Sequence, residues 1–114
     1  VESLSVIYTG THDNNTTRGW WKEASPELRR NVCRYLGFES NEENIAANLT
    51  RLAWMSSSSL AITPLQDLLN LEGNCRMNLP GTISGNWIWR CTARQFDALN
   101  PNLLREWNEI SGRA

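Results

Sequence analysis

The sequence predicts an α/β fold that is mostly helical, and three observations lead to this prediction. Two short runs, 4–9 and 60–63, are apolar and rich in residues that favour strands. The segments between and after these runs repeat apolar residues at helical spacing. The separation of the two runs leaves room for the helical crossover that parallel strands require. We therefore expect two strands of a parallel sheet together with the helices that follow them.

The first strand is expected at Leu4–Thr9, where LSVIYT forms an almost continuous apolar run that ends at Gly10. A run of this kind suits a strand that is covered on both faces. A helix is expected to begin at Pro26, because Ser25 can cap its first turn and proline has no N–H to leave unpaired there. Gly37 is expected to end it.

A second helix is predicted from Ser40 or Asn41 to about Ser57, with acidic residues in its first turn and an apolar face. The second strand is expected at Leu60–Thr63. It should end at Pro64, which has no N–H to donate to a strand ladder.

The last third of the chain is expected to hold less regular structure. A short helix is predicted at Leu65–Leu71, an irregular loop at Glu72–Gly85, and a final helix from Asn100 that ends at Gly112. Trp54 and Trp107 lie on helical apolar stripes and are expected to pack in the core. We see no repeat or linker, so residues 1–114 are expected to form one unit.

Composition argues against several classes of partner. The net charge is −1 and the basic residues are scattered, whereas nucleic acid requires a basic stripe. No apolar run is long enough to span a membrane. Three cysteines cannot all pair within the chain, which favours reduced thiols. The chain does not begin with Met, so we expect a piece of a longer polypeptide.

Polar side chains gather directly after the first strand, in Thr11-His12-Asp13-Asn14. The carboxyl end of a parallel strand is where barrel enzymes place their active sites. Two interpretations stand at this point. The residues form a site, or Asp13 or Asn14 only caps a helix toward Trp20 and His12 is an ordinary loop histidine.

A second polar segment combines amides, arginines and indoles beside glycines, in Arg76–Thr82 and Gly85–Arg90. Indole faces can cover the C–H faces of sugar rings, while Asn and Arg donate hydrogen bonds to hydroxyl groups. The alternative is that Trp87 and Trp89 project from one face of an extended segment and fill a core.

Four blocks, YTGTHDNNTTRGWW, ITPLQDLL, RMNLPGT and GNWIWR, together resemble the C-terminal part of the amylomaltase or disproportionating-enzyme family of 4-alpha-glucanotransferases. The resemblance runs from Val6 to about Arg90 and continues weakly through the final helix. It implies a fragment of a (β/α)8 barrel that covers the last two strands and the helices after them. The parent enzyme would transfer α-1,4-glucan segments between oligosaccharides by a retaining mechanism.

The resemblance also implies roles for individual residues. Asp13 corresponds to the aspartate that stabilises the transition state, His12 to a donor of a hydrogen bond to the sugar, and Asn78 to a residue that lines the sugar subsites. Asp67 receives no catalytic role. The family often has Asp where this chain has Asn15, which puts a charge-dependent role at that position in doubt. The nucleophile and the general acid/base would lie outside this chain, so the isolated chain is expected to be inactive.

The family resemblance implies maltooligosaccharides or other α-1,4-glucans as partners, with no metal and no organic cofactor. It implies a cytoplasmic location, with a plastid as the alternative. The chain on its own is expected to self-associate, because its strand edges would lack neighbours. The alternative to an enzyme part is a non-catalytic carbohydrate-binding or structural module.

Overall fold

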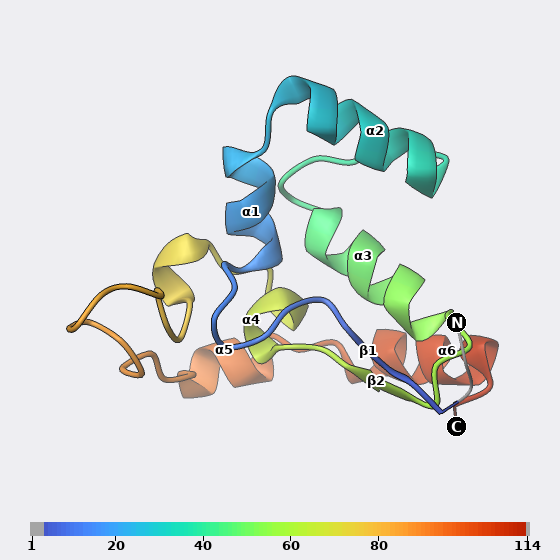
Figure 1. Ribbon diagram of the computed structural model, residues 1–114. Helices are drawn as coiled ribbons and strands as arrows, with labels where there is room; N and C mark the ends of the chain where they lie inside the picture. The colour runs from blue at the N-terminus through green and yellow to red at the C-terminus, as the bar shows by residue number, and fades with distance from the viewer. Residues whose placement is uncertain (1–3, 114) are drawn as a thin grey trace.

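The computed structural model describes residues 4–113 and shows a two-stranded parallel sheet with helices (Figure 1). The strands are β1 (Val6–Tyr8) and β2 (Leu60–Ile62), with Val6 opposite Leu60 and Tyr8 opposite Ile62. The helical elements are α1 (Thr17–Glu23), α2 (Pro26–Leu36), α3 (Ile45–Trp54), α4 (Leu65–Leu68), the 3-10 turn η1 (Gly73–Cys75), α5 (Ala93–Asp97) and α6 (Pro101–Ser111). The α/β class, the mostly helical content and the parallel pairing agree with the prediction.

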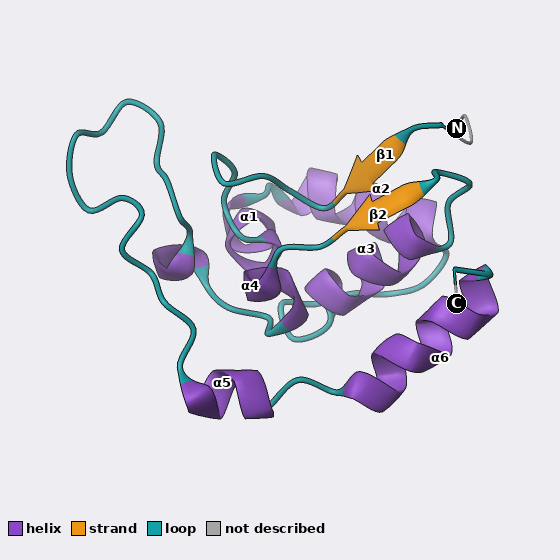
Figure 2. Cartoon of the chain, turned by 90° about the horizontal axis from the view of Figure 1, so that it is seen from below, coloured by secondary structure: helices purple, strands orange, loops and turns teal. Residues whose placement is uncertain are grey.

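The sheet is covered on one face by the described residues. Helix α3 packs on β1 (Figure 2), and Ile7 and Ala61 are the less exposed residues of the two strands. The alternate side chains of both strands are about half exposed: Val6, Tyr8, Leu60 and Ile62. The sequence predicted a strand covered on both faces, and within residues 4–113 helices supply only one cover. The other face stays open and apolar.

Helix α2 has the ends that its sequence predicts. Ser25 Oγ accepts a hydrogen bond from Leu28 N at 3.1 Å, and Pro26 occupies the first helical position. Gly37 ends the helix with φ of 86°, in the left-handed region that costs glycine least. Helix α6 is bounded in the same way by Asn100 and by Gly112, whose φ is 75°.

Helix α3 begins later and ends earlier than predicted. Asn41 and Asn44 form a turn in which Asn41 N donates to Asn44 Oδ1 at 2.8 Å, and Asn44 N donates to Asn41 Oδ1 at 3.1 Å. These local bonds compete with helical ones, so the helix starts at Ile45. At the other end, the Arg113 guanidinium binds three carbonyl oxygens, of Trp54, Ser56 and Ser58, at 2.8 to 3.1 Å and holds the chain in a turn.

The core lies where α3 meets α1, α4 and α6. Its most buried apolar side chains are Trp21, Ile45, Ala46, Ala53 and Trp107. Trp54 and Trp107 pack edge to face with ring centroids 5.7 Å apart, which confirms their predicted packing role. Trp54 Nε1 also donates to Thr63 Oγ1 at 2.8 Å and so links α3 to the end of β2.

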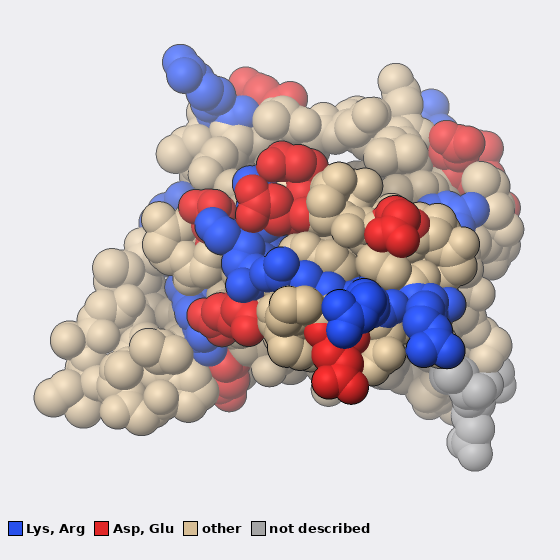
Figure 3. Space-filling model, turned by 90° about the horizontal axis from the view of Figure 1, so that it is seen from above, with Lys and Arg blue, Asp and Glu red and all other residues tan. Residues whose placement is uncertain are grey.

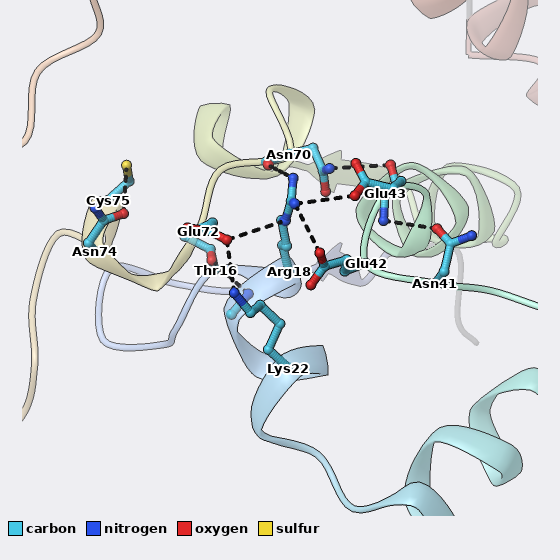
Figure 4. Close-up of polar contacts among 11 residues, drawn as sticks. Thr16, Arg18, Lys22, Asn41, Glu42, Glu43, Asn70, Glu72, Asn74 and Cys75 are labelled. Atoms are coloured by element: carbon cyan, nitrogen blue, oxygen red, sulfur yellow. Dashed lines mark hydrogen bonds and ion pairs between the residues drawn. The ribbon is translucent and has the colours of Figure 1, made fainter.

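Arg18 joins α1 to the loops around it. Its guanidinium lies between Asn70 O, at 3.4 Å, and the carboxylates of Glu42 and Glu43, at 3.4 and 3.5 Å (Figure 4). Its Nε lies 3.9 Å from Glu72 Oε1. Since only 19% of the Arg18 side chain is exposed, these partners offset the cost of withdrawing its charge from water.

Lys22 and Glu72 form a shorter ion pair beside Arg18, with Nζ and Oε1 2.9 Å apart. The hydrogen bond that Lys22 donates, together with the charge of the lysine, lowers the pKa of Glu72 below its ordinary value. The same contact raises the pKa of Lys22. Because about half of each side chain is exposed, we expect the pair to contribute little to stability.

Charged side chains of both signs lie close together on the face seen in Figure 3, where a band of Lys and Arg has Asp and Glu on both sides.

One segment of the chain carries no charge. Residues 77–89 contain no charged residue, and this segment extends away from the helices (Figures 1 and 2). It carries Trp87, which is about half exposed, so the alternative in which Trp87 fills a core is wrong.

Candidate functional site

The candidate site forms where the loop after β1 meets the uncharged segment. Asn78 Nδ2 donates to Asp13 Oδ1 at 2.6 Å, and His12 Nε2 lies 3.2 Å from Asp13 Oδ2. Asn78 N donates to His12 O at 3.1 Å. The structure therefore brings together all three site residues that the sequence predicted, although Asn78 is 65 positions from Asp13.

Asp13 does not cap a helix. The cap of α1 is Thr16, whose hydroxyl accepts from Gly19 N at 3.1 Å. Asn14 closes the turn before it, since its Oδ1 accepts from Thr11 N at 2.7 Å and from Thr11 Oγ1 at 3.0 Å. The capping interpretation of Asp13 and Asn14 is thus wrong, and the Asp13 side chain remains 51% exposed at the site.

His12 lies between Asp13 and Trp87. The imidazole and indole centroids are 4.9 Å apart and the rings are tilted by 38°. Trp87 N donates to Met77 O at 2.6 Å, so the indole is held beside the imidazole by a backbone contact. Because 54% of the His12 side chain is exposed, it remains accessible to a ligand.

The uncharged segment is folded into a closed loop by its own polar groups. Asn86 Oδ1 accepts from Leu79 N at 2.8 Å, and Asn86 Nδ2 donates to Thr82 Oγ1 at 2.9 Å. Trp87 has φ of 60°, a strained conformation for a bulky residue. Backbone strain of this kind concentrates at functional sites, where surrounding contacts maintain it.

A cleft of about 480 Å³ extends from this site onto the open face of the sheet. Its lining includes Val6, Tyr8 and Ile62 from the strands together with His12 and Arg76 from the two loops. The polar site is therefore continuous with an apolar floor at the carboxyl ends of two parallel strands. A larger hollow of about 850 Å³ lies along α2, but none of the predicted site residues lines it.

Asp67 lines the same cleft but has a structural role. The residue is 4% exposed, and its carboxylate accepts from Thr9 Oγ1 at 2.6 Å, Thr17 N at 2.8 Å and Thr17 Oγ1 at 2.7 Å. These bonds tie α4 to the end of β1 and to the first turn of α1. With its oxygens occupied in this way, Asp67 is poorly placed to act as a nucleophile, in agreement with its lack of a predicted catalytic role.

Asn15 is wedged between two glycines. A Cβ atom placed on Gly19 would lie 2.5 Å from Asn15 Oδ1, and one placed on Gly73 would lie 2.8 Å from the same oxygen. Among the described residues, Asn15 Oδ1 is buried without a hydrogen-bond partner. Asn15 therefore sets the spacing of α1 and η1 by its shape, a role that does not depend on the charge at this position.

We expect Gly19→Ala to destabilise the chain, although alanine normally favours a helix over glycine by about 0.5–1 kcal/mol. The new methyl would overlap Asn15, which Gly73 confines on its other side. Overpacking of this kind typically costs about 1–3 kcal/mol. Adding Asn15→Ala should recover most of the loss, as measured by urea unfolding at one fixed protein concentration.

Gly37→Ala is the matched control, because its cost comes from φ of 86° and nothing lies within 4 Å of the added Cβ. Asn15→Ala should therefore leave the Gly37→Ala loss unchanged. The steric role of Asn15 would be contradicted if Gly19→Ala and Gly37→Ala lowered the free energy of unfolding equally, and if Asn15→Ala changed neither loss.

Two contacts of the site could not be predicted from the sequence. Arg76 Nη2 donates to Asp13 O at 2.9 Å, and Trp87 packs on His12. The sequence pattern places Arg76 and Trp87 in a segment that suits sugar binding, but nothing in that pattern indicates that the segment meets the His12 loop. The structure shows that pairing in the ring contact of Trp87 with His12 and in the bond from Arg76 to Asp13.

Residues 4–113 contain neither a metal-binding group of side chains nor a membrane-spanning helix. No group of three or more His, Cys, Asp or Glu side chains is arranged to hold a metal ion there. In the same residues, no helix combines the length and the apolar character needed to cross a membrane.

Comparison with known proteins relates this geometry to a family. The family model described as 4-alpha-glucanotransferase matches residues 1–95. A 4-alpha-glucanotransferase of Synechocystis sp. is 50% identical over 103 residues, which are 90% of this chain and 19% of that protein. The chloroplastic/amyloplastic 4-alpha-glucanotransferase of Solanum tuberosum is 45% identical over 100 residues, covering 87% of this chain and 17% of that protein.

A solved structure gives the same result for the fold. The amylomaltase of Streptococcus agalactiae in complex with acarbose superposes with a TM-score of 0.89 at 30% identity, covering 98% of this chain and 22% of that one. The chain thus spans about a fifth of the length of the proteins that it matches. Since the family model matches most of its residues, the chain belongs to the 4-alpha-glucanotransferase family.

Proposed function

We propose that this chain is the C-terminal part of a 4-alpha-glucanotransferase that transfers α-1,4-glucan segments between maltooligosaccharides by a retaining mechanism. The observation that carries the proposal is the cluster of His12, Asp13 and Asn78 at the carboxyl ends of two parallel strands, beside an open cleft. The matched relatives are named for this activity, and the structural neighbour was solved in complex with acarbose.

Asp13 is proposed to stabilise the transition state. A retaining transfer passes through an oxocarbenium-like state in which hydrogen bonds to the sugar hydroxyls strengthen as positive charge develops. The Asp13 carboxylate is accessible to such hydroxyls, and the amide of Asn78 holds one of its oxygens at 2.6 Å. A carboxylate that is already oriented does not have to reorganise as charge develops.

His12 and Asn78 are proposed to complete the sugar-binding surface. His12 Nε2 and Asp13 Oδ2 lie 3.2 Å apart and both side chains are about half exposed, so one sugar hydroxyl beside them can donate to the carboxylate and accept from the imidazole. The indole of Trp87, half exposed beside His12, offers an apolar face for a pyranose ring.

The frame of the site is proposed to be a (β/α)8 barrel, of which β1 and β2 are the last two strands. Two features support this placement. The strands pair in parallel with helices on one face, and the open face carries the alternate side chains that would fill a barrel interior. The site loops follow the carboxyl ends of the strands, where barrel enzymes hold their active sites.

The remaining parts of the proposal follow from the family. The nucleophile and the general acid/base would come from earlier strands of the parent polypeptide, and no metal or organic cofactor would take part. The parent would work in the cytoplasm or in a plastid, and the latter matches the relatives whose names are chloroplastic/amyloplastic.

Disproportionation of maltotriose by the full-length polypeptide tests this function. We expect glucose release together with longer maltooligosaccharides, resolved by anion-exchange chromatography. An active-site carboxylate upstream of this chain should be needed for both products. Binding of maltooligosaccharides without any transfer would instead favour a non-catalytic carbohydrate-binding module.

We also propose that the isolated chain self-associates. The outer edges of β1 and β2 and their open apolar face offer backbone groups and side chains to a second copy. Light scattering should show an average mass above that of the monomer, increasing with concentration. A strict monomer at high concentration would mean that this sheet is stable without further cover.

A further inference from the structure

The guanidinium of Arg76 bridges the two loops of the candidate site. Its Nη2 donates to the carbonyl of Asp13 at 2.9 Å, while its Nε donates to the carbonyl of Asn78 at 3.0 Å. The carbonyl groups belong to the two residues whose side chains meet at 2.6 Å. The planar guanidinium of Arg76 thus donates to the main chain of both residues whose side chains form that contact.

These bonds form a closed network. Asn78 N donates to His12 O at 3.1 Å, so the backbones on each side of the contact are joined directly as well as through Arg76. The side chains that this network orients are about half exposed, at 54% for His12 and 51% for Asp13. Their positions therefore depend on loop contacts rather than on burial in a core.

We propose that Arg76 is a positioning residue, which fixes the Asp13 carboxylate and the His12 imidazole relative to a bound glucan. The inference rests on the function proposed above, and it extends that function to a residue that acts through the backbone. Arg76 is half-buried and binds two carbonyl groups here, so its role differs from that of a residue that grips sugar hydroxyls.

The geometry of the side chain explains why arginine stands here. A guanidinium presents its donors in a rigid fork, whereas the lysine ammonium is a compact point charge on a flexible stem. Replacing Arg76 removes the donors that bind the carbonyl groups of Asp13 and Asn78, and the two loops can then shift relative to each other. A displacement of about 1 Å of a catalytic group can lower the rate by about 10²-fold.

The test compares Arg76→Ala and Arg76→Lys with wild type in the full-length polypeptide. For disproportionation we expect Arg76→Ala to lower kcat by about 10- to 100-fold with little change in KM, and Arg76→Lys to keep part of kcat. Arg105→Met is the matched control, since Arg105 is exposed on α6 and lies outside the residues that the family model matches. It should retain wild-type kcat.

Chemical rescue separates positioning from general stability. The cleft beside the site is lined in part by Arg76, so it should admit ethylguanidinium to the space that Arg76→Ala leaves. We expect ethylguanidinium to restore part of kcat in Arg76→Ala, and ethylammonium at the same concentration to restore less. Equal effects of the two cations would overturn the proposal, because they would show that charge alone matters.

Other results also decide the question. An unchanged kcat in Arg76→Ala, or a raised KM with an unchanged kcat, would overturn the positioning role.

A crystal structure of Arg76→Ala gives a readout that needs no activity: we expect the Asn78 Nδ2 to Asp13 Oδ1 distance to exceed hydrogen-bond range. If it stays near 2.6 Å, the proposal fails. If Arg76→Ala does not fold, the same measurements on Arg76→Lys decide. An inactive wild type would count against the proposed function alone.

Discussion

Asp13→Asn in the full-length polypeptide is expected to lower kcat for maltotriose disproportionation by about 10²-fold or more, the scale for losing one preorganised electrostatic contact. The substitution keeps the shape of the side chain and an oxygen that can accept from Asn78, which donates at 2.6 Å in this structure. The fold should therefore survive while the negative charge is lost. Steady-state kinetics and circular dichroism on the same preparation measure both effects.

His12→Ala is the comparison for this prediction. It removes a hydrogen bond to the sugar but leaves the Asp13 charge in place, so its cost in kcat should be smaller, near the lower end of the range of about 1.5–3 kcal/mol for a hydrogen bond to a charged group. A normal kcat in Asp13→Asn would remove Asp13 from the mechanism. A loss in His12→Ala as large as that in Asp13→Asn would reverse the proposed order of their roles.

Sequence signals were sufficient where a helix end depends on local chemistry. The Ser25-Pro26 start and the Gly37 end of α2 are confirmed. The start of α3 could not be predicted in the same way, because Asn41 and Asn44 satisfy each other in a turn that competes with the helix. A residue that suits a cap also suits a turn, and the neighbours decide between them.

Helix α5 illustrates a signal that was present but not used. Thr92 and Gln95 form a capping box, in which Gln95 N donates to Thr92 Oγ1 at 3.0 Å and Thr92 N donates to Gln95 Oε1 at 2.9 Å. The Thr-x-x-Gln spacing is visible in the sequence and predicts a helix start. With five residues, Ala93–Asp97, the helix is too short for apolar periodicity to indicate it.

The candidate site was only partly predictable from the pattern of residues. Position after a strand singled out His12 and Asp13, but it left the capping alternative open. Thr16 is the cap of α1, which decides against capping by Asp13, and the contacts of Asp13 with Asn78 and Arg76 join segments 65 and 63 residues apart. Bonds over such separations depend on how the helices pack, which local sequence signals do not encode.

The isolated 114-residue chain is expected to release no glucose from maltotriose. Among residues 4–113, the buried carboxylate beside the candidate cleft belongs to Asp67, and Thr9 and Thr17 occupy its oxygens. Asp13 can stabilise charge, but a retaining transfer also requires a nucleophile and an acid/base about 5–5.5 Å apart across the scissile bond.

Size-exclusion chromatography of this chain, followed by a glucose assay on each fraction, measures that prediction. Both monomeric and associated fractions should match a no-protein control, because a second copy brings another Asp13 and Asp67 but no new kind of carboxylate site. Glucose release that follows the protein peak and disappears in Asp13→Asn would contradict the prediction. Such a result would place a complete set of catalytic groups within these residues.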